Sequence, residues 1–260
     1  MARRRRLFTK GKLAKVLMWT LGLSLAALVL TITIVVYRLH RPLYGALTPK
    51  DFEIHGIDVS HHQGEVDYAR VKQATVFGRH IRFIFAKCTE GCTKVDKRYE
   101  RNRREVRRNG FCFGAYHFYV PGRPAEEQAD NFIRHSHLKS GDLVPVLDVE
   151  KVGAMKSDKL RAEVLRWLEI VGKHYNCRPI LYTYQNFKEL HLSNSHLDGY
   201  PLWEAMYLPS AAIPDKEWTF FQYTRHGHVA GVRDGLNDYV DLDVFNGTAE
   251  DLKSLTLGDF

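Results

Sequence analysis

The chain has 260 residues, 45% of them hydrophobic, an ordinary fraction for a globular protein. The net charge of +8 comes from residues 1–41, which hold nine Lys and Arg and no acidic residue, so that the rest of the chain carries −1. This distribution excludes the basic folded domain that is typical of nucleic-acid-binding proteins. The length fits one anchoring segment and one domain of about 200 residues.

A stretch near the N-terminus predicts a membrane anchor. Val16–Tyr37 contains no charged residue, and at about 1.5 Å per residue a helix of this length crosses a bilayer core of about 30 Å. Seven Lys and Arg precede the stretch and two follow it, so the positive-inside rule predicts a cytoplasmic N-terminus. A cleaved signal peptide is the alternative, but its apolar core is usually only about 7–15 residues long.

We therefore expect a single-pass membrane protein with four parts. Residues 1–15 form a basic cytoplasmic tail, 16–37 the transmembrane anchor and 38–53 a linker. Residues 54–260 form a domain on the periplasmic or extracellular side, which we expect to be a monomer.

From Ile54 onward, short apolar runs alternate with helix-like segments. The predicted strands are Ile54–Ser60, Ile81–Cys88, Phe111–Phe118, Leu143–Glu150, Pro179–Tyr184, Pro201–Tyr207, Trp218–Tyr223 and Tyr239–Phe245. The predicted helices are Glu65–Ala74, Asp96–Asn109, Pro124–His137, Ser157–Tyr175 and Gln185–Leu190. Repeated strand–helix units predict a parallel sheet, and the loss of helices near the C-terminus predicts an irregular end. The expected fold class is α/β, an irregular (β/α) barrel of about eight strands preceded by one transmembrane helix.

The strand that ends in two acids, LVPVLDVE at residues 143–150, indicates where chemistry takes place. Asp148 and Glu150 lie two residues apart and therefore point to the same face of the strand. Buried acids are costly unless they have partners or a catalytic role, although acids exposed just beyond a strand are a common alternative. Acids and aromatic residues recur at the ends of the other predicted strands, where barrels of this type carry catalysis. Carboxyl groups supply acid–base chemistry, and Tyr and Trp faces bind sugar rings.

A series of motifs in this order makes the interpretation more specific. They are GIDVSHHQG (56–64), FAKCTEG (85–91), GAYHFYVPGRPAEEQADNF (114–132), PVLDVE (145–150), ILYTY (180–184), PLWEAMY (201–207), FFQYTRHGHVAGV (220–232) and VDLDVFNG (240–247). The series resembles the family 25 glycoside hydrolases, the bacterial and phage N-acetylmuramidases, over about residues 54–255. The resemblance implies hydrolysis of the β-1,4 bond between N-acetylmuramic acid and N-acetylglucosamine in peptidoglycan glycan strands, with no metal and no organic cofactor.

The resemblance also implies roles for single residues. Glu150 matches the general acid/base, Asp148 matches the residue that positions the acetamido group of the sugar, and Asp58 and Asp241 complete the acid cluster. Asp148 would then help the substrate's own acetamido oxygen to attack, which predicts net retention at the anomeric carbon. Substrate-binding residues are expected at Glu90, Tyr116, Tyr182, Trp203, Gln222 and Tyr223.

Several positions depart from the family pattern, and they put subsite preference in doubt rather than the reaction. They are His61–His62, Glu204, Phe221 and Asp243, of which Asp243 stands where Asn is common. Two other functions stay open: a wall-binding module without catalysis, and a metal-dependent polysaccharide deacetylase that uses Asp58, Asp148, His61 and His117. The four cysteines, Cys88, Cys92, Cys112 and Cys177, allow three full disulfide pairings or free thiols.

Overall fold

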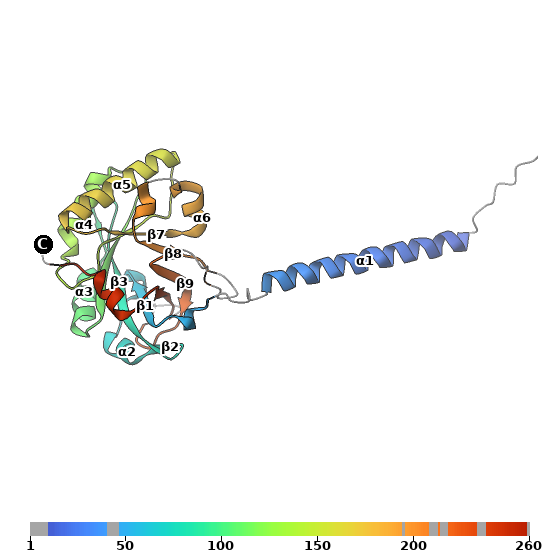
Figure 1. The fold of residues 1–260 in the computed structure, drawn as a ribbon, viewed down its shortest axis with the longest axis horizontal. Coiled ribbons are helices and arrows are strands. Elements are labelled where there is room, and N and C mark those ends of the chain that lie inside the picture. The colour runs from blue at the N-terminus through green and yellow to red at the C-terminus, as the bar shows by residue number, and fades with distance from the viewer. Residues whose placement is uncertain are drawn as a thin grey trace, which may run out of the picture. The chain divides into compact units, whose positions relative to one another are not determined.

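The computed structural model describes residues 10–40, 47–193, 196–207, 213, 218–232 and 238–258. The chain divides into two compact units, Met1–Gly45 and Ala46–Phe260. In the first unit a single helix, α1 (Lys10–His40, blue in Figure 1), contains the whole predicted anchor. A search of the described residues finds no helix long and apolar enough to cross a membrane, so the anchor stays a prediction.

The second unit is built on a closed barrel. Its ring consists of eight strands: β1 (Ile54–Val59), β3 (Arg79–Glu90), β5 (Cys112–Phe118), β6 (Val146–Asp148), β7 (Ile180–Tyr184), β8 (Leu202–Ala205), β9 (Phe220–Gly227) and β10 (Val240–Phe245). Strand β1 pairs with both β3 and β10, which closes the ring. Two short strands, β2 (Thr75–Val76) and β4 (Lys94–Val95), pair with β3 outside the ring. The predicted barrel of about eight strands is confirmed.

The last strand of the barrel differs from the prediction. The pairings from β1 through β3 to β9 are parallel, as the strand–helix repeats indicated, but β10 runs antiparallel to both β9 and β1. The parallel sheet that the strand–helix repeats predicted therefore does not include this strand, which belongs to the part of the barrel that was expected to be irregular. The reversal brings the start of β10 beside the C-terminal ends of the other strands, and Asp241 lies opposite Asp58 in the register.

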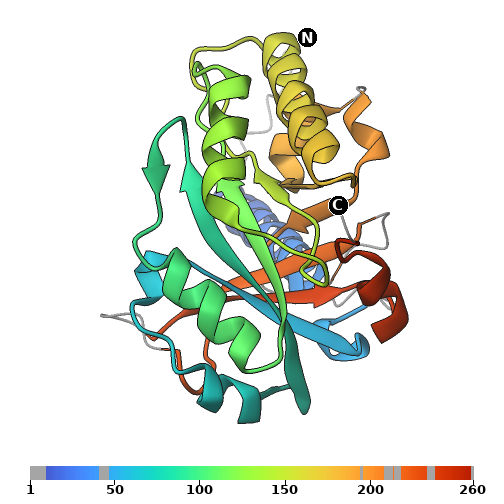
Figure 2. The same ribbon diagram turned by 90° about the vertical axis from the view of Figure 1, so that its left-hand side faces the viewer.

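Helices cover the outside of the barrel in its first two thirds (Figures 1 and 2). The longer helices are α2 (Tyr68–Gln73), α3 (Tyr99–Arg108), α4 (Ala125–Ser136), α5 (Ser157–His174) and α7 (Ala249–Ser254). After β7 the described connections contain only short turns, namely α6 (Gln185–Phe187), η3 (Lys188–Leu192) and η4 (His196–Gly199). Two further turns, η1 (Pro49–Asp51) and η2 (His61–Gln63), flank β1. The predicted loss of helices is confirmed for the described connections after β7, but α7, which follows β10, was not predicted.

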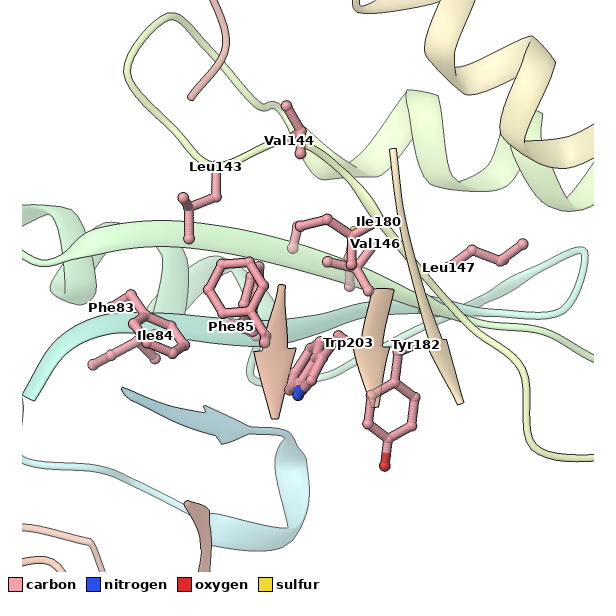
Figure 3. Close-up of a cluster of buried hydrophobic side chains, with 14 of the residues drawn as sticks. Phe83, Ile84, Phe85, Leu143, Val144, Val146, Leu147, Ile180, Tyr182 and Trp203 are labelled. Atoms are coloured by element: carbon pink, nitrogen blue, oxygen red, sulfur yellow. The ribbon is translucent and has the colours of Figure 1, made fainter. Parts of the chain in front are cut away.

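Aromatic side chains fill the interior of the barrel and form the floor beneath the acids. The rings of Phe85 and Trp203 stack with centroids 4.6 Å apart, and the ring of Tyr182 lies 4.8 Å from Trp203 (Figure 3). A Cβ atom at Gly114 would lie 2.2 Å from the Phe85 ring, so the glycine in GAYHF makes room for this packing.

The four cysteines are all free thiols in the structure.

Candidate active site

A cavity of about 490 Å³ lies where the parallel strands end. Four of its lining residues are the predicted acids Asp58, Asp148, Glu150 and Asp241. Its aromatic walls are formed by Tyr116, Phe118, Tyr182, Tyr184, Trp203 and Tyr207. The remaining lining residues are Ser60, His62, Gln63, Lys87, Gln222 and Arg225. The fold therefore brings together acids from β1, β10 and the end of β6, which are far apart in the sequence.

Asp148 is the last residue of β6, and its side chain is only 6% exposed. The alternative of an acid exposed beyond the strand is therefore wrong for this residue. Its Oδ1 atom has no hydrogen-bond partner among the described protein groups. Burial raises the pKa of Asp148 well above its usual range, and the neighbouring charge of Glu150 raises it further, whereas the ammonium groups of Lys87 and Lys151 lower it. The site thus holds a buried carboxyl group with one oxygen available to a ligand.

Glu150 lies two residues beyond Asp148 and is partly exposed to the cavity. Burial raises the pKa of Glu150 above its usual value, while the neighbouring Tyr184 hydroxyl, the ammonium groups of Lys151 and Lys87 and the Tyr182 hydroxyl lower it. A carboxyl group whose pKa is raised toward the working pH can hold a proton and release it during a reaction. Glu150 combines this raised pKa with partial exposure to the cavity, which suits it to general acid–base work.

Asp58 and Asp241 face each other across the pairing of β1 and β10. Gln222 Nε2 donates a hydrogen bond of 2.6 Å to Asp58 Oδ2, and Gln222 Oε1 accepts one of 2.9 Å from the Tyr182 hydroxyl. Burial and the charge of Glu150 raise the pKa of Asp241 to about 6, while the guanidinium group of Arg225 lowers it. Hydrogen bonds therefore connect β1, β9 and β7 around the cavity.

Comparison with known proteins identifies the family. The sequence pattern of the family described as Glycosyl hydrolases family 25 matches residues 57–232. The chain belongs to this family. It is 37% identical over 224 residues to the uncharacterized protein YegX of Escherichia coli (strain K12), covering 84% of this chain and 80% of that protein. It is 32% identical over 217 residues to Lysozyme M1 of Streptomyces globisporus, covering 78% of this chain and 71% of that protein.

Solved structures of the family have the same barrel. A family 25 glycosyl hydrolase from Bacillus anthracis matches with a TM-score of 0.69 and 28% identity, covering 82% of this chain and 97% of that one. A bacterial lysozyme from Streptomyces coelicolor matches with a TM-score of 0.69 and 31% identity, covering 78% of this chain and 96% of that one. The fold that the motifs implied is thus the fold of a family 25 hydrolase.

Two of the predicted substrate-binding residues of this family 25 hydrolase do not line the cavity. Tyr223 follows Gln222 on β9, so its side chain points to the opposite face of the sheet, where its ring lies 6.4 Å from that of Phe77. Glu90 accepts hydrogen bonds from Lys87 at 2.6 Å and from Lys94 at 3.1 Å beside a separate cavity of about 160 Å³. The other four, Tyr116, Tyr182, Trp203 and Gln222, line the main cavity as expected.

Several lining residues were not among the predicted site residues. Tyr184 lies two residues after Tyr182 on β7, so strand alternation could have identified it from the sequence. Tyr207 lies two residues after Ala205, the last residue of β8, and could have been identified in the same way. Arg225 lies within the motif at residues 220–232, but on an alternating strand it falls on the face opposite Gln222, so alternation gave no signal for it. His62, one of the positions that depart from the family pattern, also lines the cavity.

The histidines required by the deacetylase alternative do not face Asp58 and Asp148. His117 is fully buried, shares a hydrogen bond of 2.7 Å with Thr89 and stacks on Trp167, and burial lowers its pKa to about 3. His61 Nδ1 lies 2.6 Å from Asp96 Oδ2. Within the described ranges, no group of three or more His, Cys, Asp or Glu residues is arranged to hold a metal ion.

Proposed function

We propose that the domain is a peptidoglycan hydrolase of the lysozyme type, an N-acetylmuramidase that cleaves the β-1,4 bond between N-acetylmuramic acid and N-acetylglucosamine. The observation that carries the proposal is the convergence of Glu150, with its raised pKa, and the buried Asp148 in one cavity with aromatic walls. The volume of about 490 Å³ also lies within the range of about 300–1,000 Å³ that is usual for small-ligand sites.

The relatives support the same substrate class. Besides Lysozyme M1, an autolytic lysozyme of Clostridium acetobutylicum is 30% identical over 192 residues, covering 74% of this chain and 55% of that protein. The alternative of a wall-binding module without catalysis would tolerate the loss of acids from the cavity. All four acids are present and face one space, which favours the enzyme.

The proposed mechanism assigns Glu150 both proton transfers. Glu150 gives its proton to the oxygen of the leaving sugar while the acetamido oxygen of the substrate attacks the anomeric carbon from the other face. The C–O bond to the leaving sugar breaks and a cyclic intermediate forms. Glu150 then takes a proton from water, whose oxygen attacks the same carbon, opens the ring and completes hydrolysis with net retention.

Asp148 would stabilise the cyclic intermediate in this mechanism. The intermediate carries positive charge that spreads over the acetamido group, and an ionised carboxylate beside its N–H stabilises that charge. The Oδ1 atom of Asp148, which lacks a partner among the described residues, is available to accept this N–H. Burial raises the pKa of Asp148, and the ammonium groups of Lys87 and Lys151 oppose this effect. A hydrogen bond donated by the substrate N–H would lower the pKa further, toward the ionised form that this role requires.

We also propose that the N-terminus anchors the enzyme in a membrane, with the N-terminus in the cytoplasm and the monomeric domain on the periplasmic or extracellular side, where peptidoglycan lies. Support comes from the charge-free stretch Val16–Tyr37, the excess of Lys and Arg before it and the continuous helix α1 that contains it.

Digestion of purified peptidoglycan separates the three candidate functions. The full chain should lower the turbidity of a peptidoglycan suspension and generate new reducing ends. Release of acetate without new reducing ends would indicate a deacetylase. Binding to the sediment with neither product would indicate a wall-binding module, and both of these outcomes would refute the proposal.

A further inference from the structure

A second cavity, of about 160 Å³, adjoins the active-site cavity and has no role in the reaction described above. We call it the lysine cavity, and it is lined by His61, Lys87, Glu90, Lys94, Val95, Asp96 and Lys97. Lys87 lines both cavities. The rings of His61, which lines the lysine cavity, and His62, which lines the active-site cavity, lie 4.1 Å apart. The two cavities therefore meet at Lys87 and the histidine pair.

One of the two acids of the lysine cavity is already occupied by protein groups. The Asp96 side chain is fully buried. Its Oδ2 atom accepts a hydrogen bond of 3.0 Å from the His61 backbone N–H and lies 2.6 Å from His61 Nδ1. Its Oδ1 atom accepts one of 2.9 Å from the Arg98 backbone N–H. Asp96 therefore holds the wall of the cavity in place and presents no free oxygen to a ligand.

The accessible charges of the lysine cavity are mainly positive. Glu90 accepts hydrogen bonds from both Lys87, at 2.6 Å, and Lys94, at 3.1 Å, so one carboxylate serves two ammonium groups. Lys97 is exposed and forms no ion pair with a described residue. An ammonium group has three N–H donors, so each lysine keeps donors for a ligand. Three ammonium groups around one accessible carboxylate favour the binding of an anion.

Lys87 also lies beside the carboxylate that is proposed to hold the acetamido group of the substrate. Its Nζ atom lies 4.6 Å from the centre of the Phe118 ring, and Phe118 is paired with Asp148 in the register of β5 and β6. In N-acetylmuramic acid, the lactyl group is attached to the ring carbon next to the one that bears the acetamido group. With the acetamido N–H on Asp148, the lactyl branch therefore begins in the region that Lys87 borders.

We propose that the lysine cavity binds a carboxylate of the peptide that is attached to the lactyl group, so that the enzyme prefers peptide-bearing glycan strands. This inference rests on the proposed function and adds a recognition site to it. The peptide is joined through the lactyl carboxyl group, so the negative charge of a peptide-bearing strand lies on the peptide, farther from the sugar ring. Lys94 and Lys97 line the lysine cavity but not the active-site cavity, which suits this more distant charge.

Kinetics on two forms of one soluble glycan strand test the proposal. The first form carries its peptides, and in the second an amidase has removed them and left free lactyl carboxylates. The full chain in detergent is compared with its double variant Lys94→Gln/Lys97→Gln, which leaves Asp148, Glu150 and Lys87 in place. An exposed ion pair changes an equilibrium by up to about fivefold. The KM for the peptide-bearing strand should therefore rise about three- to tenfold with kcat unchanged, and the KM for the peptide-free strand should stay the same.

The peptide-free strand controls for any effect that reaches the acids through Glu90 and Lys87. A matched control variant is Lys159→Gln, which removes an exposed lysine of the outer helix α5 and should change neither KM. An equal rise in KM on both strands would assign the lysines to the lactyl carboxylate and overturn the proposal, as would no rise on either strand.

A binding measurement separates failure of this proposal from failure of the proposed function. If wild type cleaves neither strand, the proposed function fails. Both strands, labelled with a fluorophore, are then titrated with wild type and with the double variant. Wild type should bind the peptide-bearing strand about three- to tenfold more tightly than the double variant does, with no such difference for the peptide-free strand. Equal binding of the peptide-bearing strand by the two proteins would overturn the proposal.

Discussion

Replacing Glu150 with Gln tests the assignment of the general acid. The substitution keeps the length and shape of a side chain whose neighbours include the hydroxyl groups of Tyr184 and Tyr182 and the ammonium groups of Lys151 and Lys87. It removes the transferable proton. General acid–base catalysis contributes about 10²–10⁴-fold, which corresponds to about 2.7–5.4 kcal/mol of transition-state stabilisation. We expect kcat on peptidoglycan to fall by that factor with little change in KM.

The direction of the change in melting temperature of Glu150→Gln can also be predicted. Because the pKa of Glu150 is raised in the folded state, its ionisation destabilises the fold as pH rises above the unfolded-state pKa. Gln carries no charge, so Glu150→Gln should melt at or above the temperature of wild type at neutral pH. A loss of activity with an unchanged or higher melting temperature is then a loss of chemistry, not of folding.

A matched control is the exposed carboxylate Glu126, whose Oε1 atom lies 2.9 Å from Arg166 Nε on the outside of the barrel. Such exposed ion pairs contribute only about 0–1 kcal/mol, so Glu126→Gln should leave kcat unchanged. Both variants would be measured by the release of reducing ends from peptidoglycan. Glu150→Gln with more than about a tenth of wild-type kcat would refute the reasoning, because a general acid contributes at least about 10²-fold.

Two further predictions concern the same site, and a third concerns the N-terminus. Asp148→Asn should lower kcat at least about 10²-fold although Glu150 is intact, because the neutral amide cannot stabilise positive charge on the acetamido group. For wild type, proton NMR of the first product should show the β-anomer, as retention requires. An initial α-anomer would mean inversion and would contradict the mechanism. Tyr184→Phe removes a hydroxyl group that lowers the pKa of Glu150, so the fall in kcat/KM at high pH should move to higher pH, and an unchanged profile would contradict this contact. In intact cells, a protease added outside the inner membrane should digest residues 42–260 and spare the N-terminus, and protection of the domain would refute the proposed topology.

The strands and most helices of the barrel could be predicted from the sequence, but the direction of its last strand could not. Apolar runs identified all eight strands of the ring because each is buried, and the longer connecting segments carry the helices. The direction of β10 could not be predicted, because strand direction depends on pairing with residues distant in sequence. The same limit applies to the closure of β10 against β1, which brings Asp241 opposite Asp58.

The acids of the site were predictable because their spacing and motif context do not depend on the details of packing. Tyr223 shows the opposite case: its position next to Gln222 places it on the other face of β9, so a motif match does not ensure that a side chain faces the cavity. Glu90 does not line the main cavity, and it accepts hydrogen bonds from Lys87 and Lys94. Such contacts between side chains cannot be predicted from the alternation of a strand. The hydrogen bond from Gln222 to Asp58 likewise requires β9 and β1 to be placed together.

The identity of the sugar at each new reducing end tests the central claim most directly. Purified peptidoglycan would be digested with the full chain, reduced with borohydride and analysed by mass spectrometry after release of the reduced sugars. The account predicts reduced N-acetylmuramic acid at the new ends, because the proposed cleavage is on the muramic side of the β-1,4 bond. Reduced N-acetylglucosamine would show cleavage of the other glycosidic bond and would contradict the account.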